Sequence, residues 1–126
     1  MNYPLLIASI LGLTGILLGA FGDHSLQAHL SSADLESWHV ALRYHQMYAV
    51  VILVFAALKW SAIGERLAGL DWLVGLFTLG VVLFSGSIYL RILTGYSELI
   101  WLTPLGGTLL IGSWAGTIIA AILWRK

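Results

Sequence analysis

The sequence predicts an all-α integral membrane protein, a four-helix bundle with a short interfacial helix between helices one and two. Of its 126 residues, 60% are hydrophobic and only 10% are charged. So few polar side chains do not suffice to cover a soluble protein of this size. The hydrophobic residues also form four segments, each close to the roughly 20 residues that a helix needs to cross a bilayer. We place these segments at residues 4–22, 40–60, 72–92 and 104–124, within a single domain covering residues 1–126.

The first segment begins with a proline and carries small residues along one side. Pro4 suits a first helical turn, where its missing N–H would be unpaired anyway. The small residues recur at spacings of four and three, and they are Ala8, Gly12, Gly15, Gly19 and Gly22. In lipid, such residues let two helices approach closely. We expect them mainly to pack helices within one subunit; the alternative is a homo-oligomer that forms through the same glycine-rich faces.

Polar residues follow the first segment in the stretch GAFGDHSLQAHL, residues 19–30. Gly22 is expected to end the spanning helix, and Asp23 to cap a short helix over about 24–30 that lies along the outer membrane surface. This lid would bring His24 and His29 close to His39 and Arg43 at the start of the next helix.

The second helix is predicted to begin in water, because its amphipathic pattern starts near Ser32. A polar pair lies deeper, at His45 and Gln46. These two side chains should face the interior of the bundle, since an unpaired imidazole or amide among lipid tails costs several kcal/mol. Above them, spacings of three and four favour a hydrated ladder of charged groups, formed by Glu36, His39 and Arg43.

The third and fourth segments are separated by recognisable breaks. Residues 61–71 contain two glycines and several charged residues, and Gly95 lies in a short turn at 94–98. Thr103 and Pro104 open the fourth segment, with Thr103 as the expected N-cap. Trp114 falls inside that helix, so its indole N–H needs a partner in the bundle. Connections this short predict antiparallel neighbours.

The basic residues favour an orientation with both termini in the cytoplasm. One side of the membrane would carry four of them, Lys59, Arg66, Arg125 and Lys126. The other side would carry two, Arg43 and Arg91. Five tryptophans fall near the predicted interfaces, as aromatic belts do, and they are Trp38, Trp60, Trp72, Trp101 and Trp124.

The charge and the lack of cysteine limit the kinds of partner and chemistry that the sequence predicts. The formal charge is zero at pH 7, so nothing suggests binding to nucleic acid, and the lipid bilayer is the partner that the composition implies. Without cysteine there is no disulfide and no thiolate chemistry. No cofactor is indicated.

Three blocks of sequence resemble the domain of unknown function 423 family of small membrane proteins. The blocks are GAFGDHSL, the segment RYHQMY, and LFSGSIYL with the nearby TPLGG. Asp23 replaces the small residue that is usual in the family, and Tyr48 stands where relatives commonly have a second membrane histidine. The resemblance implies a four-helix fold and a bacterial inner-membrane protein, and it brings no established activity. The matching positions are Gly19, Ala20, Phe21, Gly22, His24, Leu26, Tyr44, Phe84, Ser85, Gly86, Ser87, Tyr89, Thr103, Pro104, Gly106 and Gly107.

The candidate functional residues form a polar cluster near the outer side of the membrane. We expect a multi-pass structural or accessory protein, not an enzyme, whose outer polar collar recognises a partner or a small ligand. One alternative is a small-solute or proton pathway through His45. A metal-dependent membrane enzyme is another, although His24 and His29 are five residues apart, which is poor spacing for two ligands on one helix. The cluster consists of Asp23, His24, His39, Arg43, Tyr44, His45, Gln46, Ser87 and Tyr89.

Overall fold

The computed structural model describes all residues except 62–63, 65–68 and 124–126. The described residues form four α-helices, which are α1 (Tyr3–Phe21), α2 (Ser32–Lys59), α3 (Leu70–Thr94) and α4 (Leu102–Leu123). A π-helical turn, η1 (Gly22–Leu26), follows α1, and a 3₁₀ turn, η3 (Ser97–Trp101), precedes α4. All four helices are long and apolar enough to cross a membrane, which confirms the prediction of a four-helix membrane protein. Three basic residues used for the orientation, Arg66, Arg125 and Lys126, lie outside the described residues.

The sequence places the ends of the helices with ordinary capping devices. The Asn2 side chain accepts a hydrogen bond from the backbone N–H of Leu5 at 3.0 Å, and Ser31 caps α2 in the same way. Glycines at positive φ flank α3, with Gly69 at 92° before it and Gly95 at 76° after it. The start of α2 at Ser32, eight residues before the predicted span, agrees with its early amphipathic pattern.

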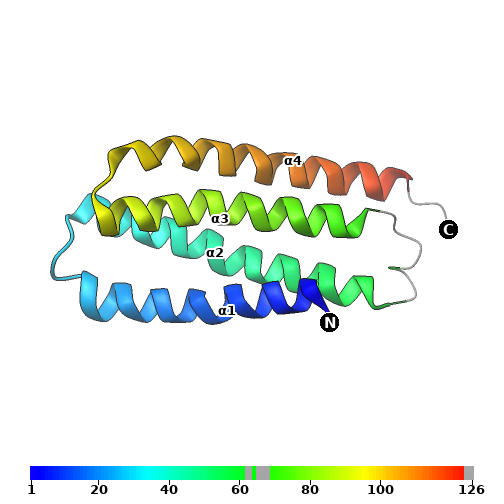
Figure 1. Cartoon of the computed structure of the whole chain (residues 1–126), viewed down its shortest axis with the longest axis horizontal. Helices are drawn as coiled ribbons and strands as arrows, with labels where there is room; N and C mark the ends of the chain where they lie inside the picture. Colours follow the sequence, from blue (N-terminus) through cyan, green and yellow to red (C-terminus); the bar gives the residue numbers. More distant parts are fainter. Residues whose placement is uncertain (62–63, 65–68, 124–126) are drawn as a thin grey trace.

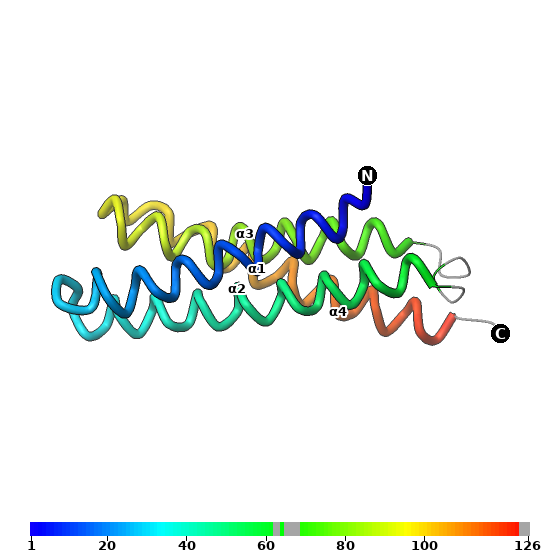
Figure 2. The backbone as a smooth tube through the Cα atoms, turned by 90° about the horizontal axis from the view of Figure 1, so that it is seen from below, coloured from blue at the N-terminus to red at the C-terminus, as the bar shows by residue number. Residues whose placement is uncertain are grey.

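The helices pack in chain order, each antiparallel to the next (Figure 1). The main contacts join α1 to α2, α2 to α3, and α3 to α4, while α1 touches α3 only slightly. Figure 2 shows the same arrangement from below. The two central helices are therefore the most buried, at 39% and 44% of their spans, against 22% and 17% for the first and last. The core lies between α2 and α3, around Ile52, Phe77 and Val81.

Small residues pack the helices closely at some positions and face outward at others. A Cβ on Gly15 would lie 3.2 Å from the Gln46 side chain, and one on Gly19 would lie 3.3 Å from Leu42. One on Gly106 would collide with the backbone of α3. A Cβ on Gly12 would meet nothing within 4 Å. The glycine stripe of α1 thus packs against α2 over part of its length, and Gly12 opens to the surroundings.

The structure does not confirm the short interfacial helix at 24–30. Gly22 keeps right-handed helical angles, φ −60° and ψ −49°, so α1 runs directly into η1 instead of ending there. One wider turn, closed by the Gln27 N–H on the Gly22 carbonyl at 3.0 Å, then leads into the connection to α2. Asp23 does not act as a cap, because its carboxylate points to His39.

Two predictions for α4 have different outcomes. Thr103 is not the N-cap, because η3 continues directly into α4 at Leu102 and the Thr103 hydroxyl lies 2.6 Å from that of Ser87. Trp114 has the partner that its indole required, since its N–H donates to the Tyr48 hydroxyl at 3.0 Å. This bond joins α4 to α2 across α3.

Candidate functional site

The predicted cluster divides between the end of the bundle that carries η1 and η3, here called the η1–η3 end, and the interior below it. At the η1–η3 end, Asp23 Oδ1 lies 3.3 Å from His39 Nε2, and both side chains are exposed. His24 and Arg43 are exposed as well. His29 Nδ1 lies 3.0 Å from the carbonyl of Ser25, within its own turn.

The charged ladder on α2 is absent from the part of the chain that the structure describes. There, no ion pair involves Glu36 or Arg43. The expected approach of His24 and His29 to the start of α2 is replaced by the contact between Asp23 and His39. The physical reason is the π-helical turn η1, which continues α1 through Gly22. Asp23 therefore lies beside His39 at the start of α2, where the lid helix was expected.

His45 is buried and joins three helices. Its Nε2 lies 3.2 Å from the Thr14 hydroxyl of α1, and its Nδ1 lies 3.3 Å from the Tyr89 hydroxyl of α3. Thr14 already donates its single hydroxyl proton to the Ile10 carbonyl, at 2.7 Å. Thr14 must therefore accept from Nε2–H, which leaves Nδ1 to accept from Tyr89. These contacts favour a neutral imidazole with its proton on Nε2.

Trp38 extends this network toward the η1–η3 end. The side chain is fully buried, and its indole N–H donates to the Leu18 carbonyl at 3.2 Å. Its ring packs on Tyr89, with centroids 4.7 Å apart. Gly22 makes room for it, because a Cβ there would lie 2.4 Å from Nε1. Trp38 is therefore a core residue and not part of an interfacial belt.

The remaining predicted residues lie on other surfaces of α2 and α3. Gln46 Nε2 donates to the Gly15 carbonyl at 3.5 Å, but its side chain stays exposed, so the interior position predicted for the pair holds for His45 only. Tyr44 packs against Phe84 with centroids 4.6 Å apart. Ser87 is buried and pairs with Thr103, between α3 and α4.

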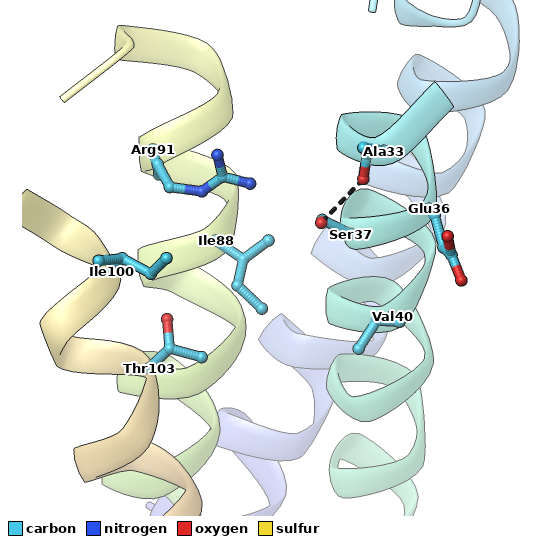
Figure 3. Close-up of a pocket in the computed structure, with 8 residues that line it drawn as sticks. All are labelled: Ala33, Glu36, Ser37, Val40, Ile88, Arg91, Ile100 and Thr103. Carbon is cyan, nitrogen blue, oxygen red and sulfur yellow. Dashed lines mark hydrogen bonds between the residues drawn. The ribbon is translucent and has the colours of Figure 1, made fainter. Parts of the chain in front are cut away.

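A cleft of about 490 Å³ opens at the η1–η3 end between α2, α3 and the start of α4. Figure 3 shows Arg91 and Ile88 reaching into it from α3, and Ser37 facing them from α2. Arg91 Nη2 lies 3.2 Å from Asp34 Oδ1, and the Asp34 side chain is 38% exposed. The cleft is lined by Ala33, Glu36, Ser37, Val40, Ile88, Arg91, Ile100 and Thr103.

A smaller cavity of about 110 Å³ lies beside His45. The surface of its wall is mostly apolar, with Leu11, Val81 and Val82 beside His45, Ser85 and Tyr89. A cavity with such walls holds water poorly. Within the described residues, no three His, Cys, Asp or Glu side chains are grouped as a metal site would require.

A family model and several relatives match the chain over most of its length. A family model described as "Protein of unknown function (DUF423)" matches residues 18–107. The UPF0382 membrane protein YwdK of Bacillus subtilis is 38% identical over 124 residues, covering 97% of this chain and 98% of the relative. A UPF0382 membrane protein of Haemophilus influenzae is 33% identical, with 90% and 88% covered. The UPF0382 inner membrane protein YgdD of Escherichia coli is 31% identical, with 99% and 93% covered.

No solved structure matches the chain. The matched residues 18–107 include Trp38 and all residues that line the cleft beside Arg91. The relatives extend the likeness along nearly the whole sequence. Four apolar helices and relatives of this kind lead to one conclusion: the chain is a membrane protein of the DUF423 family.

Proposed function

We propose that this chain is a multi-pass accessory protein of the bacterial inner membrane that binds a small amphiphilic molecule in the cleft at its η1–η3 end. The observation that carries the proposal is the cleft itself, which combines an aliphatic wall with a charged group at the bundle end. Its volume of about 490 Å³ falls within the roughly 300–1,000 Å³ of typical ligand pockets.

The lining fits a molecule with a polar head and an apolar tail. Ile88, Val40 and Ile100 supply apolar surface, and Arg91 supplies a cation at one end. The hydroxyls nearby are engaged within the protein, because Ser37 donates to the Ala33 carbonyl at 2.9 Å and Thr103 pairs with Ser87. This arrangement supports binding more than it supports nucleophilic catalysis.

The location rests on the relatives and on the basic residues. A relative, YgdD, carries the name inner membrane protein. Lys59 ends α2, opposite the cleft, and Arg125 and Lys126 follow α4 in the sequence. By the positive-inside rule, we place both termini in the cytoplasm and the cleft at the outer face.

A proton or solute pathway through His45 is less well supported. Both ring nitrogens lie within hydrogen-bonding distance of hydroxyls, and the surface of the cavity beside the ring is mostly apolar. Interhelical hydrogen bonding explains a polar group at this depth. The same reasoning assigns His45 a structural role at the junction of α1, α2 and α3.

Filling the cleft tests the proposal. Ser37→Trp would occupy the space between α2 and α3 without changing a charge. Ser9→Trp is the matched control, because Ser9 likewise donates to the carbonyl four residues earlier, Leu5, but lies on an exposed face of α1. Native mass spectrometry of protein purified in mild detergent would measure the amphiphiles retained. Ser37→Trp should lose them while wild type and Ser9→Trp keep them; equal retention by all three contradicts the proposal.

A further inference from the structure

We propose that the ligand of the cleft is a zwitterionic phospholipid with a primary ammonium group, of the phosphatidylethanolamine class. This inference rests on the proposed function and names its ligand. The cation at the cleft, Arg91, accounts for the phosphate. The carboxylate of Glu36 accounts for the ammonium.

Arg91 keeps hydrogen-bonding capacity for a phosphate. A guanidinium carries five N–H donors and binds phosphate oxygens in a bidentate manner. Among the described residues, Arg91 forms an ion pair through Nη2 with Asp34 Oδ1. Asp34 is fixed from its other side, since its Oδ2 accepts from the Ser31 hydroxyl at 2.9 Å. The pair can therefore stay in place while the remaining donors of Arg91 hold a phosphate.

Glu36 decides the sign of the remaining charge. It is among the residues that line the cleft on α2, and Figure 3 shows its carboxylate on the side of α2 away from Arg91, turned from the guanidinium. No ion pair joins Glu36 to any residue that the structure describes. Since Asp34 already balances Arg91, the cleft retains one negative charge from Glu36. A purely anionic head would be repelled by it, whereas an ammonium beside the phosphate compensates it.

The apolar wall accounts for the rest of the molecule. Ile88 and Val40 face each other below the charged residues, and Ile100 adds a third aliphatic side chain. We place the membrane interface at the amphipathic start of α2, where the cleft lies, so that an acyl chain in this groove continues into the bilayer. The head is then held at the level of Arg91.

A comparison of two phospholipids tests the inference. Phosphatidylethanolamine and phosphatidylglycerol with identical acyl chains share the phosphate diester and differ in having an ammonium or a neutral diol. Their affinities for the whole protein would be measured by native mass spectrometry titration in detergent. We expect phosphatidylethanolamine to bind about twofold to fivefold more tightly, the range for a single exposed ion pair.

Variants test whether Glu36 binds the ammonium and Arg91 binds the phosphate. Glu36→Gln should abolish the preference, and Glu98→Gln, an exposed glutamate in η3 outside the cleft, should retain it. Arg91→Gln should weaken both lipids about tenfold or more through loss of charge-assisted bonds, with Arg43→Gln as the control. Because Arg91→Gln leaves Asp34 unpaired, Arg91→Lys is measured beside it. Lysine keeps the charge without the planar donors, and it should give an intermediate affinity.

The outcomes separate the two proposals. If wild type binds phosphatidylglycerol as tightly as phosphatidylethanolamine, or if Glu36→Gln keeps the preference, the assignment of the ammonium is wrong while the cleft remains a binding site. If the binding of both lipids is unaffected by Ser37→Trp, the cleft is not the site and the proposed function fails as well.

Discussion

Replacement of Gly22 by alanine tests how closely the end of α1 packs on α2. A Cβ at this position would lie 2.4 Å from Trp38 Nε1 and 2.8 Å from its Cδ1. Trp38 has no room to retreat, because it is fully buried and its ring packs against Tyr89. Forced displacement of the ring costs about 1–3 kcal/mol as overpacking. Loss of the indole bond to the Leu18 carbonyl adds about 1 kcal/mol.

The expected loss in the free energy of unfolding is therefore about 2–4 kcal/mol, or roughly 30-fold to 1,000-fold in the unfolding equilibrium. Unfolding in mixed micelles, driven by increasing SDS and followed by circular dichroism, measures it. Gly12→Ala is the matched control, since its Cβ would meet nothing within 4 Å, and its stability should be unchanged or slightly higher. Equal stabilities of the two variants would refute the packing argument.

Four further predictions concern the core, the α3–α4 contact, sidedness and self-association. His45→Leu should lower the free energy of unfolding by about 1–3 kcal/mol, because Thr14 and Tyr89 lose their shared partner; it should leave proton flux into liposomes unchanged, and a flux seen only with wild type would favour the pathway alternative. Gly106→Ala places a Cβ 2.3 Å from the backbone N of Phe84 and should destabilise the protein by about 1–3 kcal/mol or more, whereas Gly112→Ala, with open space around it, should not; similar SDS titrations for both would contradict this. Tyr96→Cys should react with a membrane-impermeant maleimide added to intact cells and Trp60→Cys should not, both positions being exposed at opposite ends of the bundle; the reverse labelling pattern would invert the topology. Gly12→Leu should reduce chemical crosslinking between copies if the open glycine face of α1 mediates a homo-oligomer, and unchanged crosslinking would remove that face as the interface.

The lengths and order of the helices could be predicted from the sequence because they depend on local properties. About 20 apolar residues must form a helix in lipid, and glycines such as Gly69 and Gly95 end or begin it. The predicted spans consequently differ from α1, α3 and α4 by only one or two residues at each end within the described chain. The burial of His45 followed from the same rule, since an imidazole at that depth needs a partner.

The partners of the polar side chains could not be predicted, because they depend on how each helix is rotated about its axis. Trp38 is adjacent to charged residues in the sequence and was expected at the interface, yet α2 turns it into the core. Thr14 lies in an apolar run and is outside the predicted polar cluster, although its hydroxyl contacts His45. The pair of Asp34 and Arg91 joins residues far apart in the sequence.

The π-helical turn at Gly22 was missed for a different reason. A glycine followed by an aspartate is typical of a helix end and a new cap. Here the Trp38 ring needs a neighbour without a side chain, so the glycine serves a packing contact and the helix continues through it. A single sequence does not distinguish these two uses of glycine.

The protein consists of two helical hairpins, α1–α2 and α3–α4, which bonds between α2 and α3 hold together. Among the described residues, links between them such as Ser85 to the Ala41 carbonyl at 2.8 Å and Arg91 to Asp34 are formed by residues inside the helices or their first and last turns. Residues 1–60 and 69–126, produced as separate polypeptides in one membrane, should therefore recognise each other and restore the cleft without a peptide bond between them.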